Sequence, residues 1–207
     1  MQRRIGMSFP VQHWILRKLS AYRGFFYVPP FTFMVFTFYK EWEEDLIVWP
    51  LGMMIILVGV SFRLWATKHI GRRMPWMKKK GKNLVRTGPY AIVRNPLYFG
   101  NIIIASGLSI LSELIWMVPI LMFYLFILYH LVVLYEEKKL LGRWAEEYRA
   151  YLTEVPRWIP RLRDFYKCKA NGFKWMDSLR SELPSLFVLL FGIFVFAAKE
   201  ILSPVFE

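Results

Sequence analysis

The sequence predicts an all-α integral membrane protein with about five transmembrane helices, an irregular loop at the cytosolic surface and a C-terminal amphipathic helix. Of the 207 residues, 56% are apolar although the formal net charge is +13, so apolar and charged residues must be segregated along the chain. Five apolar segments approach the roughly 20 residues that a helix needs to cross a bilayer. Basic residues fall in alternate connecting segments, which is typical of a multi-pass protein.

The N-terminal region, residues 1–66, is predicted to hold an interfacial helix and two membrane spans. The stretch VQHWILRKLSAYR has apolar side chains on one helical face and basic side chains on the other, which favours a helix lying at the membrane surface. The first span is predicted at 22–39, with a kink at Pro29-Pro30. The second span is predicted at 47–66.

The third and fourth spans, at 97–112 and 114–135, are separated only by Ser112-Glu113. They should therefore form a tight antiparallel hairpin. Beyond the fourth span, Leu140, Trp144 and Tyr148 recur at helical spacing, so the helix is expected to continue as an amphipathic segment whose apolar stripe is core.

The last region, residues 166–207, is predicted to be a basic linker followed by a fifth span at 184–202. The positive-inside rule places the N-terminus, the 67–96 loop and the 136–183 segment in the cytosol, and the C-terminus outside. The membrane is expected to be a prokaryotic cytoplasmic membrane, or the endoplasmic reticulum in a eukaryote. We attribute the positive charge to this orientation and to anionic lipid, and expect no nucleic-acid partner.

The stretch RTGPYAIVRNPLYFG, residues 86–100, precedes the third span. Pro89 and Pro96 forbid a continuous helix, so an irregular backbone should lead into the membrane. Irregular backbone at membrane depth persists only where protein or a polar cavity surrounds it, and its free N–H and C=O groups can hold a polar ligand. The alternative is a simple re-entry loop with Arg94 on a lipid phosphate.

Two glutamates, Glu136 and Glu137, follow the fourth span close to the predicted membrane surface. Glu136 lies one turn before Leu140, so its carboxylate is expected on the packed face with a cationic partner. Arg94, Lys82 or the ammonium group of a ligand are the candidates. The alternative is a surface pair between Glu136 and Lys139.

Together these stretches resemble the isoprenylcysteine carboxyl methyltransferase family and its relatives, the membrane phospholipid methyltransferases. The resemblance covers about residues 63–160, within a predicted core at 67–165. Its motifs are KNLV (82–85), GPY (88–90), RNPLYFG (94–100), EEKKL (136–140), and WAEEYRAY followed by VPRWIP.

The resemblance implies S-adenosylmethionine (SAM) as the cofactor, held by a cytosolic cofactor-binding loop and the helix after the hairpin. The implied cofactor-binding residues are Lys82, Asn83, Leu84, Val85, Tyr90, Asn95, Pro96, Leu97, Tyr98 and Glu136. Glu136 would accept the α-ammonium of the methionine moiety. Arg94 would pair with its carboxylate or brace the loop.

The implied substrate is a lipophilic methyl acceptor that enters from the bilayer: a phospholipid amine, an isoprenoid carboxylate or a thiol. An amine must lose a proton before methylation, and Glu137, His130 or a tyrosine could accept it. Val132 stands where the enzymes that act on prenylated cysteine carry an arginine, which argues against that substrate. The sequence predicts membrane lipids as partners and no metal ion.

The sequence is also compatible with two other functions. A membrane sterol reductase has a similar C-terminal half and binds NADPH, but its loop signature differs from Pro-Leu-Tyr. A non-enzymatic transporter or lipid-binding protein would place ionisable groups along a pathway at mid-membrane. Arg63 and His130 are the nearest candidates for such groups, and both lie close to the cytosolic ends of their spans.

Overall fold

The structure is a computed structural model that describes residues 10–38, 44–70, 84–168 and 174–202. In these ranges every regular element is a helix, which confirms the predicted all-α fold class. The α-helices are α1 (Pro10–Ala21), α2 (Val28–Phe36), α3 (Asp45–Ile70), α4 (Pro96–Leu111), α5 (Met117–Glu154) and α6 (Trp175–Leu202). Three short 3-10 helices lie between them: η1 (Phe25–Tyr27), η3 (Gly88–Ala91) and η4 (Leu162–Lys167).

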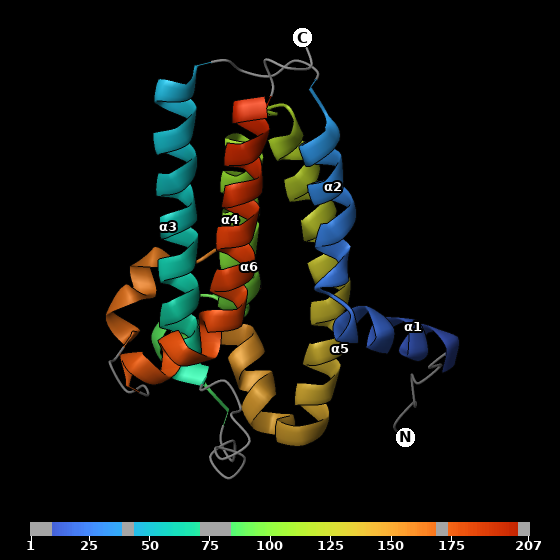
Figure 1. The fold of residues 1–207 in the computed structure, drawn as a ribbon. Helices are drawn as coiled ribbons and strands as arrows, with labels where there is room; N and C mark the ends of the chain where they lie inside the picture. The colour runs from blue at the N-terminus through green and yellow to red at the C-terminus, as the bar shows by residue number, and fades with distance from the viewer. Residues whose placement is uncertain (1–9, 39–43, 71–83, 169–173, 203–207) are drawn as a thin grey trace.

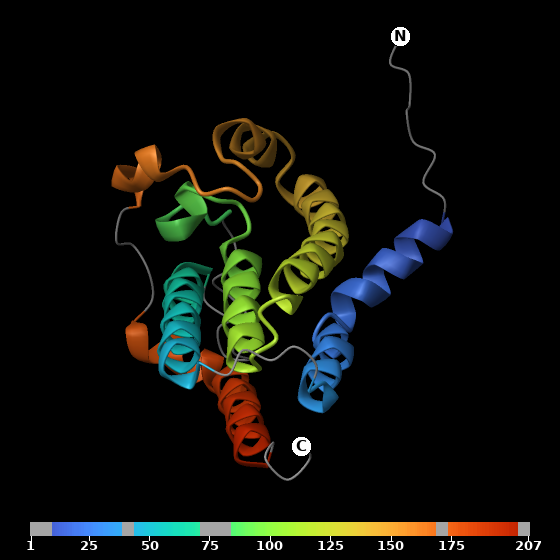
Figure 2. The same ribbon diagram turned by 90° about the horizontal axis from the view of Figure 1, so that it is seen from above.

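Helices α2 to α6 form an upright bundle, and α1 extends sideways from its lower half (Figure 1). Seen from above, α4 lies between α3 and α5, and α1 projects away from the bundle (Figure 2). Helix α1 carries exposed Trp14 and Ile15. Its orientation across the bundle is the one expected of an interfacial helix.

Three helices, α3, α5 and α6, are long and apolar enough to cross a membrane. The predicted first and third spans correspond to the shorter apolar helices Phe25–Phe36 and Pro96–Leu111. Prolines lie at the start of both: Pro29 and Pro30 at the start of α2, and Pro96 as the first residue of α4. The expected kink at Pro29-Pro30 is therefore a helix start, because proline fits the first helical turn, where its missing N–H has no intrahelical partner.

The hairpin between α4 and α5 is tight, as predicted. Helix α4 ends at Leu111, and the backbone N–H of Glu113 donates to the carbonyl of Ile110 (2.8 Å). Glu113 adopts a positive φ of 65°. The turn thus reverses the chain within a few residues, so α4 and α5 run antiparallel (Figure 1).

Helices α3 and α4 pack with their backbones in contact. A Cβ atom on Gly59 would lie 3.0 Å from the carbonyl oxygen of Gly100, and one on Gly107 would lie 2.9 Å from that of Gly52. Small residues at such positions let membrane helices approach closely and gain van der Waals contact. This packing fixes α4, which carries the site described below, on α3.

Helix α5 continues past the predicted end of the fourth span but breaks once. Trp144 and Ala145 leave the helical region, with φ/ψ of −127°/28° and 1°/−90°. The apolar stripe still forms core: Tyr148 and Tyr151 are buried in a small cluster that Leu140 also contacts. The break turns the last part of α5 at the lower end of the bundle (Figure 1).

Candidate functional site

The irregular loop before α4 is held tightly by its surroundings. Gly88 has a φ of +60°, which favours glycine, and a Cβ atom there would lie 2.2 Å from the imidazole ring of His69. The next residues, Pro89 to Val93, are all buried. The loop is therefore part of the packed structure.

A second segment, residues 155–161 after α5, pairs with this loop. The backbone N–H of Arg94 donates to the carbonyl of Pro156 (2.9 Å), and that of Arg161 donates to the carbonyl of Ile92 (3.0 Å). The side-chain amide of Asn95 donates to the carbonyl of Arg157 (3.1 Å). The motif VPRWIP thus satisfies polar groups of the irregular loop that no helix ladder could satisfy.

Glu137 lies between two arginines, one from each of these segments. The Nη1 atom of Arg94 lies 3.1 Å from the Oε1 of Glu137. Arg157 donates to both carboxylate oxygens, from Nε to Oε1 (3.1 Å) and from Nη2 to Oε2 (2.7 Å). The Glu137 side chain is only 9% exposed. A buried carboxylate held by two guanidinium groups joins α5, the loop and the 155–161 segment at one point.

Glu136 has different surroundings. Its Oε1 accepts a hydrogen bond from the Tyr98 hydroxyl (2.9 Å) and another from Arg23 (3.2 Å), and its side chain is 36% exposed. Tyr98 in turn packs against the ring of Tyr129, with centroids 4.5 Å apart. Glu136 is therefore a partly open carboxylate beside an aromatic pair.

The roles expected for the two glutamates are thus partly exchanged. Arg94 pairs with Glu137, whereas Glu136 pairs with Tyr98 and Arg23. Glu137 faces the packed loop, and Glu136 is the more exposed of the two. Consecutive helical residues point about 100° apart, so only one of the pair can face the loop.

The third predicted catalytic residue, His130, lies two turns before Glu137 on α5. Its Nδ1 accepts a hydrogen bond from the indole N–H of Trp158 (3.4 Å), and the two rings are stacked with centroids 6.4 Å apart. The structure therefore joins Arg94 and Glu137 directly. It connects His130 to them through adjacent residues of one segment, Arg157 and Trp158.

Several buried polar atoms around the loop have no hydrogen-bond partner among the described residues. They are the Tyr90 hydroxyl, the Arg94 Nε and both ring nitrogens of His69. The backbone carbonyl of Tyr90 accepts from the Tyr151 hydroxyl (2.7 Å), but its own hydroxyl is unpaired, and burial raises the pKa of that phenol well above its usual range. Buried polar atoms are normally hydrogen-bonded, so these four atoms are available for contact with a ligand or a water molecule.

The remaining predicted cofactor-binding residues fall into three groups. Leu84 and Val85 are half-buried at the start of the loop, and Leu84 packs on the Tyr148 cluster. Pro96 is buried and Leu97 half-buried in the first turn of α4. Lys82 and Asn83 lie outside the described residues.

Sequence reasoning missed two arginines of this site. Arg157 was visible within VPRWIP, but nothing in that motif indicated that the chain returns to Glu137. Arg23 comes from the turn after α1 and contacts Glu136 across 113 positions of sequence. Only the packing of α1 against α5 brings it there.

The fold and this site define a helical membrane protein with a polar centre where an irregular loop meets a long helix. Residues 47–146 match the phospholipid methyltransferase family, which confirms over that range the resemblance indicated by the motifs. No solved structure matches the chain.

Two curated proteins are similar to the chain. The nickel-cobalt-cadmium resistance protein NccN of Alcaligenes xylosoxydans xylosoxydans is 32% identical over 62% of this chain and 59% of its own length. The cobalt-zinc-cadmium resistance protein CzcN of Cupriavidus metallidurans is 29% identical over 58% of this chain and 52% of its own length. The match thus spans little more than half of each relative.

Proposed function

We propose that this protein is a SAM-dependent membrane methyltransferase that acts on a lipophilic acceptor entering from the bilayer. The family match over residues 47–146 supports a membrane methyltransferase. The observation that carries the proposal is the contact of the glutamate pair of α5 with the irregular loop, through Arg94–Glu137, and with the first turn of α4, through Tyr98–Glu136. These are the two stretches that carry the family motifs.

The residues around the loop fit this cofactor chemically. SAM has an ammonium group, a carboxylate, polar ribose and adenine edges, and a flat apolar ring. Glu136 offers a partly exposed carboxylate for the ammonium. The unpaired Tyr90 hydroxyl offers a polar partner, and Leu84, Val85 and Leu97 offer apolar surface for the ring.

SAM would supply an electrophilic methyl group, and this chain's residues would position it and exclude water. Arg94 and Arg157 fix Glu137, so we assign these three residues to bracing the loop. Both oxygens of Glu137 already accept hydrogen bonds from arginine. The Nδ1 of His130 accepts from the Trp158 indole, and this is the one basic nitrogen of a neutral imidazole, so His130 could take a proton from an amine substrate only after this hydrogen bond opens.

The test is methyl transfer by the reconstituted protein. The full-length protein in liposomes is incubated with methyl-labelled SAM and a membrane lipid extract, and the labelled product is identified. We expect labelled lipid from the wild type, little from Glu136→Gln, and normal labelling from Glu147→Gln, which removes an exposed charge from the same helix. Binding of NADPH without methyl transfer would instead favour the reductase function.

A second candidate function is a role in tolerance of divalent metal ions. Two relatives are named as metal resistance proteins, and the described residues include a carboxylate cluster, Asp45, Glu113 and Glu200, that could hold a metal ion. The expectation of no metal partner is therefore unsupported.

Expression in a cobalt- and cadmium-sensitive strain separates the two candidates. If methylation underlies metal tolerance, the Glu136→Gln variant should lose that tolerance. If the carboxylate cluster underlies metal tolerance, the Glu113→Gln variant should lose it instead.

A further inference from the structure

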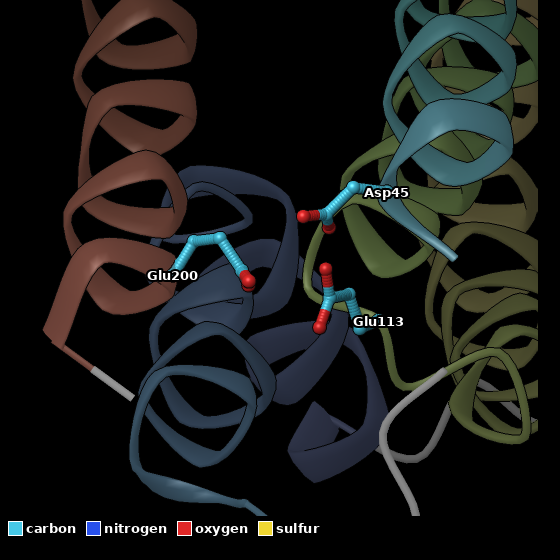
Figure 3. A group of neighbouring side chains, drawn as sticks. All are labelled: Asp45, Glu113 and Glu200. Carbon is cyan, nitrogen blue, oxygen red and sulfur yellow. The ribbon is translucent and has the colours of Figure 1, made fainter. Parts of the chain in front are cut away.

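Three carboxylates meet at the end of the bundle opposite the loop. Asp45 is the first residue of α3, Glu113 lies in the turn between α4 and α5, and Glu200 lies near the end of α6. Their nearest oxygen atoms all lie within 4.8 Å of one another, and the side chains converge in Figure 3. Asp45 and His69, which lies beside the loop, are at opposite ends of α3. A helix rises about 1.5 Å per residue, so the two residues are about 36 Å apart along α3.

Glu113 is the unusual member of the cluster. The residue is only 5% exposed, and its Oε1 receives no hydrogen bond from any described residue. Its carboxylate is directed into the space between Asp45 and Glu200 (Figure 3). A buried carboxylate oxygen without a donor is costly unless a positive charge or a shared proton compensates it.

The surroundings of Glu113 increase that cost. Burial, reinforced by Asp45 and Glu200, raises the pKa of Glu113 to about 8. The nearest basic side chain on α6, Lys199, directs its ammonium to the backbone carbonyls of Thr37 (2.8 Å) and Ser112 (3.4 Å). Glu44, beside Asp45, is exposed and adds further negative charge at this end.

We propose that Asp45, Glu113 and Glu200 bind one divalent cation. Carboxylate oxygens without nitrogen or sulfur ligands suit hard cations such as Mn²⁺, Mg²⁺ and Ca²⁺. Ligand oxygens lie about 2.0–2.6 Å from such ions, so two on opposite sides are about 4–5 Å apart. The observed cluster fits that span with little movement.

The bound cation would join three parts of the fold. Asp45 belongs to α3, Glu200 to α6 and Glu113 to the α4–α5 turn, so one ion would hold these elements together at this end. The site shares no residue with the proposed cofactor site. Cation binding there would not depend on methyltransferase activity.

The test is Mn²⁺ binding by the full-length protein in detergent at pH 8, measured by the loss of the free-ion electron paramagnetic resonance signal. We expect one Mn²⁺ per chain and at least about tenfold weaker binding for Glu113→Gln, since ligand charge sets the affinity of such sites. The control Glu44→Gln removes an exposed charge at the same end and should bind Mn²⁺ as the wild type does. Ca²⁺ should compete.

Two results would overturn this inference. One is no Mn²⁺ binding at millimolar concentration, in which case a shared proton compensates Glu113. The other is equal weakening by Glu44→Gln and Glu113→Gln, which would indicate diffuse attraction to a negative surface. Each variant is also tested for S-adenosylhomocysteine binding, so failure of the cation site is distinguishable from failure of the cofactor site.

Discussion

At the scale of single residues, Glu136 and Glu137 occupy different environments although they are adjacent. Glu137 is buried between Arg94 and Arg157, whereas Glu136 is partly exposed beside Tyr98. The buried Glu137 can support the fold, and the partly exposed Glu136 remains accessible to a ligand. Substitution of each should therefore affect a different measurement.

We predict that Glu137→Gln destabilises the protein by about 3 kcal/mol, because it leaves two partly buried guanidinium groups without their carboxylate. Thermal unfolding in detergent measures this change. The control is Glu146→Gln, which removes one partner of an exposed pair with Arg149 on the same helix and should change stability little. Equal stability of the two variants would show that the contacts of Glu137 with Arg94 and Arg157 do not stabilise the loop.

At the scale of elements, the α3–α4 interface depends on backbone contact at glycines. A Cβ atom on Gly59 would lie 3.0 Å from two backbone atoms of α4. These atoms are the carbonyl oxygen of Gly100 and the amide nitrogen of Ile104. Backbone cannot rotate aside as a side chain can. Any larger residue must therefore push the helices apart.

We predict that Gly59→Val destabilises the protein by about 1–3 kcal/mol through this overpacking. The unfolding midpoint in detergent is the measurement. Val58→Leu, at an exposed position on the same helix, serves as the control and should leave the midpoint unchanged. A midpoint for Gly59→Val equal to that of Val58→Leu would contradict the close packing of α3 on α4.

The sequence predicted the elements better than their ends. Apolar length and charge alternation located all five apolar helices, but the first, predicted at 22–39, proved shorter. The break at Trp144-Ala145 was not predicted, since neither residue is a helix breaker and the apolar stripe continues across it. Helical periodicity records which residues are buried and is insensitive to such a bend.

The sequence predicted that the loop lies close to the two glutamates, but it did not predict which residues pair. Motif order placed Arg94 and the two glutamates together, yet the pairing depends on the rotation of α5 about its axis. Arg23 and Arg157 reach the site through packing and chain reversal. Likewise, Asp45, Glu113 and Glu200 are distant in sequence, so no local pattern indicated their cluster.

At the scale of the whole molecule, the loop, the broken part of α5 and α1 lie at one end of the bundle, and the Glu113 turn lies at the other (Figure 1). The charge pattern of the sequence assigns the first end to the cytosol. On this prediction, we expect the proposed cofactor site to face the aqueous compartment that contains SAM and the carboxylate cluster to face the opposite compartment.

Two cysteine positions test this orientation. Cys168 lies at the end of η4 near the loop, and we predict that a membrane-impermeant maleimide labels it in inverted vesicles but not in intact cells. Glu44→Cys in a Cys168→Ser background should show the reverse pattern. Labelling of Cys168 in intact cells would place the loop outside and remove the proposed access to cytosolic SAM.

The central claim is that the loop and the glutamate pair hold SAM through Glu136. Calorimetric titration of the purified full-length protein with S-adenosylhomocysteine tests it most directly, because this product retains the α-ammonium. We predict one-to-one binding by the wild type and by Glu147→Gln, and binding at least about tenfold weaker by a stably folded Glu136→Gln. No binding by the wild type, or unchanged binding by Glu136→Gln, would contradict the account.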